Sequence, residues 1–307
     1  MAIIVKVMGG LASQLHKYAV GRALSLKHNQ ELKLDLTWFE ATPLGDTPRM
    51  LLLDRFHVEY EVASHSEIKI LKGSRLRNAI AGRVMAISGV DLSTPTRFSG
   101  KRLNDFSHNK KSMSFPSCGA YLEGELVGDG VFSDIREKLL LEFTLRPDFI
   151  TSKVREMAEK MQMSHSVAIH IRRGDYLSNP NALRYHVSCG LAYFQSAMNI
   201  MKKRTGEYPL SFFLFSDDIE WLQENMKHFP AGSEVVKEFT DEQSFFLLSK
   251  CKHFVISNSG FSWLAAWAGY TENSVVIAPT VWLKDKDKNN KHVQEMKFGE
   301  MVLVDNE

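Results

Sequence analysis

The stretch VAIHIRRGDY, residues 167–176, joins the pattern of a β-strand to an unusual cluster of charge. From Val167 onward every second residue is apolar, which is typical of a strand with one face on a core. The opposite face carries His170 and Arg172, and a second arginine, a glycine and Asp175 follow at once. Two adjacent guanidiniums at a strand end suit a diphosphate, which they can hold with bidentate hydrogen bonds. The alternative is an Arg–Asp pair that closes a turn, with the histidine filling the sheet face.

Outward from this strand, helix and strand patterns alternate through the second half of the chain. Helices are predicted at 149–163, about 187–203, from 219, at 242–250 and from 262. Strands are predicted at 167–171, 212–215, 253–256 and, as the last one, 275–278. This alternation predicts an α/β fold with a parallel sheet. The polar run KDKDKNNK at 284–291 is interpreted as a solvated surface loop.

The first half begins with the same kind of pattern and then becomes less regular. A β-branched strand at 2–7 is followed by two glycines, a helix at 11–26 and a strand at 31–36. Between 49 and 119 only a helix near 64–72 and a basic segment at 75–83 stand out. An amphipathic segment at 131–143 is interrupted at Leu145-Arg146-Pro147. We therefore place a boundary near residue 148, between domains 1–148 and 149–307.

Composition and charge narrow the classes of protein to consider. The 307 residues are 44% hydrophobic and 24% charged, as in soluble globular proteins. The formal net charge of +2 predicts no nucleic-acid partner. Three cysteines without CxxC spacing predict free thiols in a reducing cytosol. No secretory signal and no apolar stretch long enough for a membrane span is present, so we expect a cytoplasmic protein, with peripheral association at the inner membrane as the one form of membrane contact left open.

A second strand end carries two adjacent acids, in FSDD at 215–218. Asp218 can accept hydrogen bonds from an amide-like N–H edge, such as that of guanine. Asp217 has capping-box spacing to Glu220, so a helix cap is the competing interpretation, and it is favoured for Asp217. Two acids without further ligands are a poor metal signature, and we predict no bound metal.

A third strand end is ISNSGFSWLAAWAG at 256–269, where a strand runs through a small polar loop into a helix. The helix N-terminus offers free N–H groups, and Ser259 and Ser262 add hydroxyls, which together suit phosphate oxygens. Trp263 and Trp267 lie four residues apart on one helical face and are assigned to the core. Because ligands of open α/β sheets bind beyond the carboxyl ends of the strands, the three strand ends predict one site.

The segment MGGLASQL at 8–15 places two glycines between the first strand and the first helix. It does not match GxGxxG, so as a dinucleotide fingerprint it is weak. A close approach of the backbone to a ligand and a plain tight turn are both open interpretations.

Together these motifs resemble those of the α-1,2-fucosyltransferases. HIRRGDY, SDD and NSGFSW occur in that family's order, with GGLASQL near the start and DEQSFFLLSKCKHFVISNS before the last motif. The resemblance covers nearly the whole chain and is strongest over 166–269. It implies a GT-B architecture, in which two Rossmann-like domains with mostly parallel sheets face each other. Domain 1–148 would then lie on the acceptor side, and domain 149–307 would bind GDP-fucose.

The same resemblance implies an inverting, metal-independent galactoside α-1,2-fucosyltransferase. It would move L-fucose from GDP-β-L-fucose to the 2-hydroxyl of a β-galactoside in a glycan or a surface polysaccharide such as an O-antigen, with no cofactor besides the donor. Arg172 and Arg173 would hold the diphosphate and stabilise its developing charge in place of a metal ion. The residues implied in donor binding are His170, Arg172, Arg173, Asp218, Ser259, Phe261, Ser262, Gly10, Ser13 and Gln14. The oligomeric state is left open.

The residue that accepts the proton of the acceptor hydroxyl is not fixed by the motifs. Asp175 is the nearest candidate, and we group it with Arg172 and Arg173 as catalytic. Asp175 can equally orient one of the two arginines. His16 and His186 are weaker candidates, because histidines on helices and loops are more often solvated or packed in a core.

Two further hypotheses come from departures and absences. Where the family usually reads GGLGNQ, this chain has GGLASQ at 9–14. That departure motivates a GDP-sugar-binding protein of the same fold that has lost activity. The third hypothesis is a Rossmann-type oxidoreductase, and the missing GxGxxG and the basic cluster stand against it.

Overall fold

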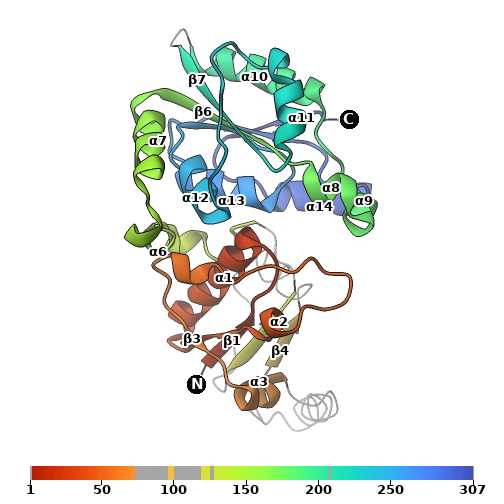
Figure 1. The fold of residues 1–307 in the computed structure, drawn as a ribbon. Helices are drawn as coiled ribbons and strands as arrows, with labels where there is room; N and C mark the ends of the chain where they lie inside the picture. Colours follow the sequence, from red (N-terminus) through yellow and green to blue (C-terminus); the bar gives the residue numbers. More distant parts are fainter. Residues whose placement is uncertain (1, 73–95, 100–118, 125–127, 207–208, 307) are drawn as a thin grey trace. The chain divides into compact units, whose positions relative to one another are not determined.

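The computed structural model describes residues 2–72, 96–99, 119–124, 128–206 and 209–306. The chain divides into two compact units, Met1–Phe143 and Thr144–Glu307, each built around one β-sheet (Figure 1). The sequence places this boundary slightly later, near residue 148. All strand pairings among the described residues are parallel, so the predicted α/β class with mostly parallel sheets is confirmed.

The first unit contains a five-stranded sheet in the order β3-β2-β1-β5-β4. Its strands are β1 (Ala2–Lys6), β2 (Glu31–Asp35), β3 (Glu61–Val62), β4 (Thr96–Ser99) and β5 (Ala120–Glu123). Its helices are α1 (Leu11–His28), α2 (Thr37–Glu40), α3 (His65–Lys72) and α6 (Arg136–Glu142), with 3-10 turns at Leu53–Arg55 and Ser133–Ile135. Helix α1 packs closely on the sheet, because a Cβ added at Gly21 would lie 2.5 Å from the Val5 side chain and 2.7 Å from that of Leu32.

The second unit contains a six-stranded sheet in the order β11-β10-β9-β6-β7-β8. Its strands are β6 (His165–Ile171), β7 (Leu210–Ser216), β8 (Glu234–Val235), β9 (His253–Val255), β10 (Val276–Pro279) and β11 (Met301–Val304). Its helices are α7 (Ser152–Met163), α8 (Gly174–Ser178), α9 (Pro180–Tyr185), α10 (Leu191–Thr205), α11 (Ile219–Glu224), α12 (Asp241–Leu248), α13 (Gly260–Gly269) and α14 (Lys286–Glu295), with 3-10 turns at Pro147–Phe149 and Met226–His228.

The order of these strands creates a switch point in the middle of the sheet. The chain builds β6, β7 and β8 outward in one direction, then returns and adds β9, β10 and β11 on the other side of β6. Strands β6 and β9 are therefore neighbours, with Ala168 paired to Phe254. In doubly wound sheets the ends of two such strands leave a crevice between diverging connections, and ligands bind there.

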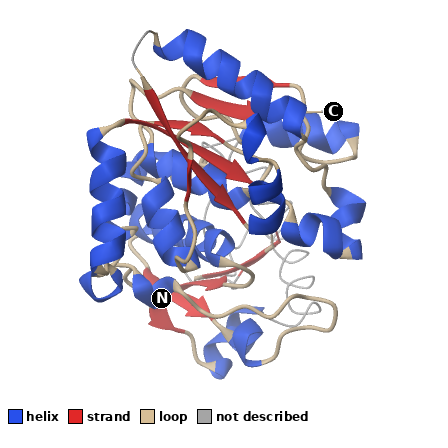
Figure 2. Ribbon diagram, turned by 45° about the horizontal axis from the view of Figure 1, so that its top comes forward, coloured by secondary structure: helices blue, strands red, loops and turns tan. Residues whose placement is uncertain are grey.

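Helices cover both faces of this sheet (Figure 2), and the period of two in β6 assigns each side chain to a face. Val167, Ile169 and Ile171 are buried in one apolar cluster with residues of α10, including Phe194. His170 points to the other face, where it stacks on Phe261 of α13. The strand pattern read from the sequence is thus confirmed, with β6 beginning at His165.

The predicted surface loop at 284–291 is wrong, because α14 begins within it. Asp285 caps this helix by accepting a hydrogen bond of 3.1 Å from the Lys288 backbone N–H. Its buried side includes Asn289, whose Oδ1 accepts a hydrogen bond of 2.7 Å from the Trp282 N–H. The first buried apolar residue of the helix is Val293, beyond the polar run, so the run itself carries no apolar period.

Other differences from the sequence predictions concern the number and the bounds of single elements. The strand at 275–278 is not the last, since β11 follows it. The helix expected from about 187 begins at Leu191. The basic segment at 75–83 lies outside the described residues.

Trp263 and Trp267 are each 1% exposed, as predicted for core residues. Among the described helices, none combines the length and the apolar character needed to cross a membrane.

Candidate functional site

The candidate site lies at the carboxyl ends of β6, β7 and β9, beside the switch point of the second sheet. Ile171 at the end of β6 pairs with Ser216 at the end of β7, and Ile169 pairs with Val255 at the end of β9. The residues that follow these three strands are therefore brought to one edge of the sheet. All three motifs predicted to form one site converge there.

Arg172 is the first residue beyond β6, and its backbone and side chain are held separately. Its N–H donates a hydrogen bond of 3.2 Å to Ser257 Oγ. Its Nη1 forms an ion pair with Asp217 Oδ2 at 3.1 Å. Its guanidinium carbon also lies 5.6 Å from the ring centre of Tyr176 in α8. The turn between β7 and α11, which contains Asp217, thus supplies the counter-charge of Arg172.

Arg173 is fixed along its whole length except at its tip. Its N–H donates to Asp217 Oδ1 at 2.8 Å, and its Nε donates to Asp218 Oδ2 at 3.2 Å. The guanidinium carbon lies 4.2 Å from the ring centre of Trp221, within the range of a cation–π contact. No described residue hydrogen-bonds to its Nη1 or Nη2. These two nitrogens form an oriented fork of donors that is available to an anion.

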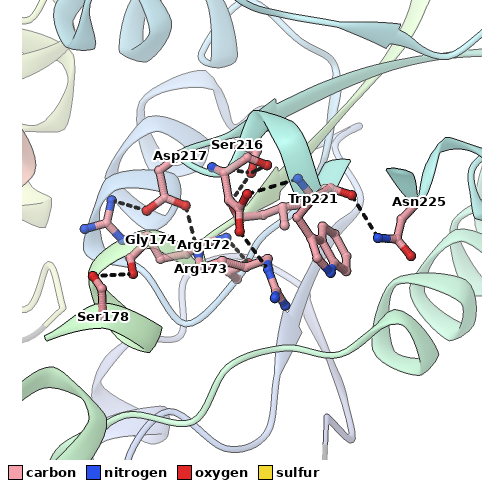
Figure 3. A network of polar contacts seen from close by, with 11 residues as sticks. Arg172, Arg173, Gly174, Ser178, Ser216, Asp217, Trp221 and Asn225 are labelled. Carbon is pink, nitrogen blue, oxygen red and sulfur yellow. Dashed lines mark hydrogen bonds and ion pairs between the residues drawn. The ribbon is translucent and has the colours of Figure 1, made fainter. Parts of the chain in front are cut away.

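The two guanidiniums do not lie side by side. In Figure 3 they are on opposite sides of the turn, one beside Asp217 and the other near Trp221. Arg–Asp pairs of the kind considered from the sequence are present, but their acids come from the end of β7. Asp175 lies in α8, and its side chain is outside the described part of the structure.

Of the two acids of FSDD, Asp218 and not Asp217 makes the helix cap. Asp218 is the N-cap of α11, and its Oδ1 accepts a hydrogen bond of 3.0 Å from the Trp221 N–H. The expected cap at Asp217 is wrong, because β7 runs to Ser216 and the helix begins at Ile219, one residue later than a cap at Asp217 requires. Asp218 therefore both ends the loop and orients Arg173. Asp217 contacts the arginine turn, residues 172–174, which follows β6.

His170 is buried on the sheet face behind this turn, with 6% of its surface exposed. Its ring stacks on Phe261 with 5.5 Å between ring centres and an angle of 29°. Burial, with a smaller effect from the charge of Arg172, lowers the pKa of His170 to about 3. The imidazole is therefore neutral at physiological pH, with one nitrogen that donates and one that accepts. Its Nδ1 has no hydrogen-bond partner among the described residues.

The loop after β9 connects the other elements of the site. Ser257 Oγ donates a hydrogen bond of 2.6 Å to the His170 carbonyl and accepts the one from Arg172. Asn258 is 1% exposed and its carbonyl accepts a hydrogen bond of 2.8 Å from the Tyr176 hydroxyl. Both residues tie the loop to the segment after β6. Neither was predicted, because their partners are far away in the sequence.

The two serines predicted at the start of α13 have different environments. Ser259 is its N-cap residue and makes no side-chain capping hydrogen bond. Ser262 is fully buried, and its Oγ donates to the carbonyls of Ser259 at 3.2 Å and Ser257 at 3.5 Å. The Ser262 hydroxyl thus stabilises the first turn of the helix.

Three residues predicted to bind the donor, Gly10, Ser13 and Gln14, lie in the first unit. Gly10 is the N-cap of α1, and Ser13 Oγ accepts a hydrogen bond of 2.6 Å from Lys17 Nζ. Gln14 is fully buried. Its amide donates to the carbonyls of Gly9 and Met50 and accepts from the Leu52 N–H, at 2.9, 2.8 and 2.8 Å. Gln14 therefore fixes the glycine turn to the segment around residue 51.

The two histidines considered as bases have partners of their own. His16 Nε2 lies 2.8 Å from the Gly128 carbonyl oxygen, and its ring contacts Phe132 edge-on at 5.1 Å. His186 stacks on Tyr176 with 4.5 Å between ring centres and an angle of 5°. Both rings are thus in contact with neighbouring aromatic side chains.

Comparison with known proteins identifies the family of the chain. Residues 106–299 match the model of glycosyl transferase family 11. An alpha-1,2-colitosyltransferase of Escherichia coli is 31% identical over 292 residues, 94% of each chain. The O-antigen biosynthesis glycosyltransferase WbnK of Escherichia coli is 27% identical, over 92% of this chain and 95% of its own. Among solved structures, the Arabidopsis thaliana FUT1 mutant R284K in complex with GDP superposes with a TM-score of 0.52 at 10% identity, over 90% of this chain and 69% of its own, and so shares the fold. The chain belongs to glycosyl transferase family 11.

Proposed function

We propose that this glycosyltransferase moves L-fucose from GDP-β-L-fucose to the 2-hydroxyl of a β-galactoside in a surface polysaccharide or related glycan, with inversion and without a metal ion. The observation that carries the proposal is the guanidinium of Arg173. It is held by Asp218 and Trp221 at a strand end, and its two terminal nitrogens have no partner among the described residues. Such a group is oriented for an anion before the anion arrives.

Fucosyl transfer leaves negative charge on the departing GDP and develops positive charge at the anomeric carbon, as in other glycosyl chemistry. A fixed guanidinium beside the diphosphate stabilises that negative charge most when the bond to the sugar breaks. Because Arg173 is already oriented, little reorganisation is needed at that moment. Arg172 supplies the second positive charge from the other side of the turn.

The nucleoside part of the donor is assigned to the face that carries His170. Its neutral ring has a buried nitrogen that lacks a hydrogen-bond partner among the described residues, and leaving such an atom unpaired is costly. Phe261 beside it offers an aromatic surface. Hydroxyls or ring nitrogens of a nucleoside supply the missing partner. Asp218 and Ser259, which follow β7 and β9, the two neighbours of β6, are proposed as further contacts of the nucleoside.

The relatives support this reaction class and suggest one alternative donor sugar. One is named an α-1,2-colitosyltransferase and another an O-antigen glycosyltransferase, and the solved structure of similar fold is bound to GDP. Colitose is therefore the second candidate sugar for the same nucleotide and the same 2-hydroxyl. Membership of a glycosyltransferase family disfavours the oxidoreductase hypothesis.

The departure at GGLASQ motivates the binding protein without activity. In the first unit Gln14 nevertheless makes three backbone hydrogen bonds that fix the glycine turn. The substitution of alanine and serine before Gln14 therefore leaves the turn supported. We retain the active enzyme as the proposed function, with Asp175 as the proposed base.

The test is calorimetric titration with GDP-fucose, followed by measurement of GDP release with and without lactose. We expect binding and a lactose-dependent release. Binding of GDP-fucose without GDP release in the presence of any β-galactoside favours the binding protein. A parallel titration with a colitose donor of the same nucleotide distinguishes the two sugars, and a chain that binds neither contradicts the donor site altogether.

A further inference from the structure

Asp217 joins two parts of the arginine turn through one carboxylate. Its Oδ2 lies 3.1 Å from Arg172 Nη1, and its Oδ1 accepts a hydrogen bond of 2.8 Å from the Arg173 N–H (Figure 3). The register explains this contact, because Ile171 pairs with Ser216 and the next residues of both strands come face to face. One side chain thus directs a guanidinium and fixes the backbone of the following residue.

Gly174 makes room for this carboxylate. A Cβ at Gly174 would lie 2.7 Å from Asp217 Oδ2 and 3.1 Å from its Cγ. Gly174 is not among the residues with positive φ, so the glycine is required for space and not for its backbone conformation. The arginine turn after β6 and Asp217 after β7 are therefore packed directly against each other.

This ion pair contributes little to the stability of the fold. The side chains of Arg172 and Asp217 are 23% and 25% exposed, and ion pairs that water reaches contribute little to stability. Asp218 differs, because it caps α11 in addition to pairing with Arg173. A substitution of Asp217 is therefore expected to alter the direction of the Arg172 side chain while the second unit of the chain stays folded.

We propose that Asp217 is a positioning residue for donor binding, which holds Arg172 and the Arg173–Gly174 backbone in the orientation that receives a nucleoside diphosphate. The proposal rests on the proposed function, in which the arginines bind the diphosphate. A carboxylate close to a bound diphosphate also repels it. Positioning therefore predicts that the loss of Asp217 weakens binding, whereas a competing carboxylate predicts that its loss strengthens binding.

The test is a double-mutant cycle on the full chain, with the dissociation constant of GDP measured by calorimetry. The variants are Asp217→Asn, Arg172→Ala and the double substitution. The Asn variant keeps an oxygen for the Arg173 N–H and loses the charge. Glu220→Gln is the matched control, since Glu220 is an exposed acid on α11 and its loss changes the net charge equally.

We expect Arg172→Ala to weaken GDP binding at least tenfold and Asp217→Asn to weaken it about three- to tenfold, in the lower part of the range typical of residues in direct contact. The double variant should match Arg172→Ala alone, because Asp217 acts through Arg172. Asp217→Glu supports the same conclusion if it also weakens binding, since it keeps the charge and moves the carboxylate by one methylene. Glu220→Gln should bind as wild type.

The outcomes separate the two proposals. If Arg172→Ala weakens binding while Asp217→Asn and Asp217→Glu bind GDP as well as or better than wild type, positioning is overturned and the donor site stands. If the effect of Asp217→Asn adds fully to that of Arg172→Ala, Asp217 acts independently and positioning is equally overturned. If Arg172→Ala binds GDP like wild type, the diphosphate assignment of Arg172 falls, and positioning falls with it.

Discussion

Replacing Arg173 by lysine keeps the positive charge of this residue and removes its planar fork. In the wild-type chain Nε pairs with Asp218 at 3.2 Å, and the guanidinium lies 4.2 Å from the ring centre of Trp221. The two terminal nitrogens are then presented to the diphosphate. A lysine ammonium has one nitrogen, so it cannot pair with Asp218 and offer two parallel donors to phosphate oxygens at the same time.

The magnitude follows from the contacts that are lost. A cation–π contact of this kind is worth about 0.5–2 kcal/mol, and a hydrogen bond to a charged group about 1.5–3 kcal/mol. Lysine retains one point-charge contact, so we take the low end of the sum, about 2 kcal/mol. This corresponds to GDP binding about 30-fold weaker. Arg173→Ala loses every contact, and transfer should fall roughly 100- to 1,000-fold.

The assay is calorimetric titration with GDP, accompanied by a thermal melt of each variant. Arg155→Lys is the matched control, because Arg155 is an exposed arginine on α7, away from the strand ends. It should bind GDP like wild type. An Arg173→Lys variant whose dissociation constant is within twofold of wild type would refute the reasoning, since a point charge would then serve as well as the fork.

Three further predictions concern other parts of the site. Gly174→Ala should weaken GDP binding about as much as Asp217→Asn, because the added Cβ displaces that carboxylate; Gly190→Ala, where a Cβ meets no atom within 4 Å, should not change the dissociation constant. In the unfolded chain His170 has its ordinary pKa of 6.5, whereas in the folded chain its pKa is about 3. The free energy of unfolding should therefore fall as the pH drops from about 6.5 toward 3. Urea titrations should show a smaller fall for His170→Asn, and an equal fall in both chains would contradict the lowered pKa of His170. Transfer should proceed unchanged in a chelator, and a loss that divalent cations restore would disprove a metal-free reaction.

Much of the secondary structure of the second unit was predictable because it depends on residues a few positions apart. The alternation from Val167 to Ile171 requires only the two-residue period of a strand. The spacing of Trp263 and Trp267 requires only the period of a helix, and both are buried. The three polar strand ends were recognisable for the same reason, since each is a short run of unusual residues after an apolar one.

The predictions failed where a small shift or a distant partner mattered. The helix cap is Asp218 and not the predicted Asp217, because β7 ends at Ser216 and α11 begins at Ile219. A difference of one residue in the helix start was enough to make this prediction wrong. Helix α14 was missed because its buried side begins with Asn289, a polar residue whose partner is the backbone at Trp282. A hydrophobic pattern does not report a buried side chain that is satisfied by hydrogen bonds.

The chain's own residue pattern was thus enough to establish the α/β class, the three motifs and the chemistry they favour. Their assembly into a site depended on the strand order, in which β6 and β9 became neighbours. That order brought Ser257 to Arg172, 85 residues away in the sequence, and Asp217 to Arg173, 44 residues away. Short-range sterics specify each strand and helix, whereas the sheet order results from burying apolar faces contributed by distant segments, and the geometry of the arginine turn follows from that burial.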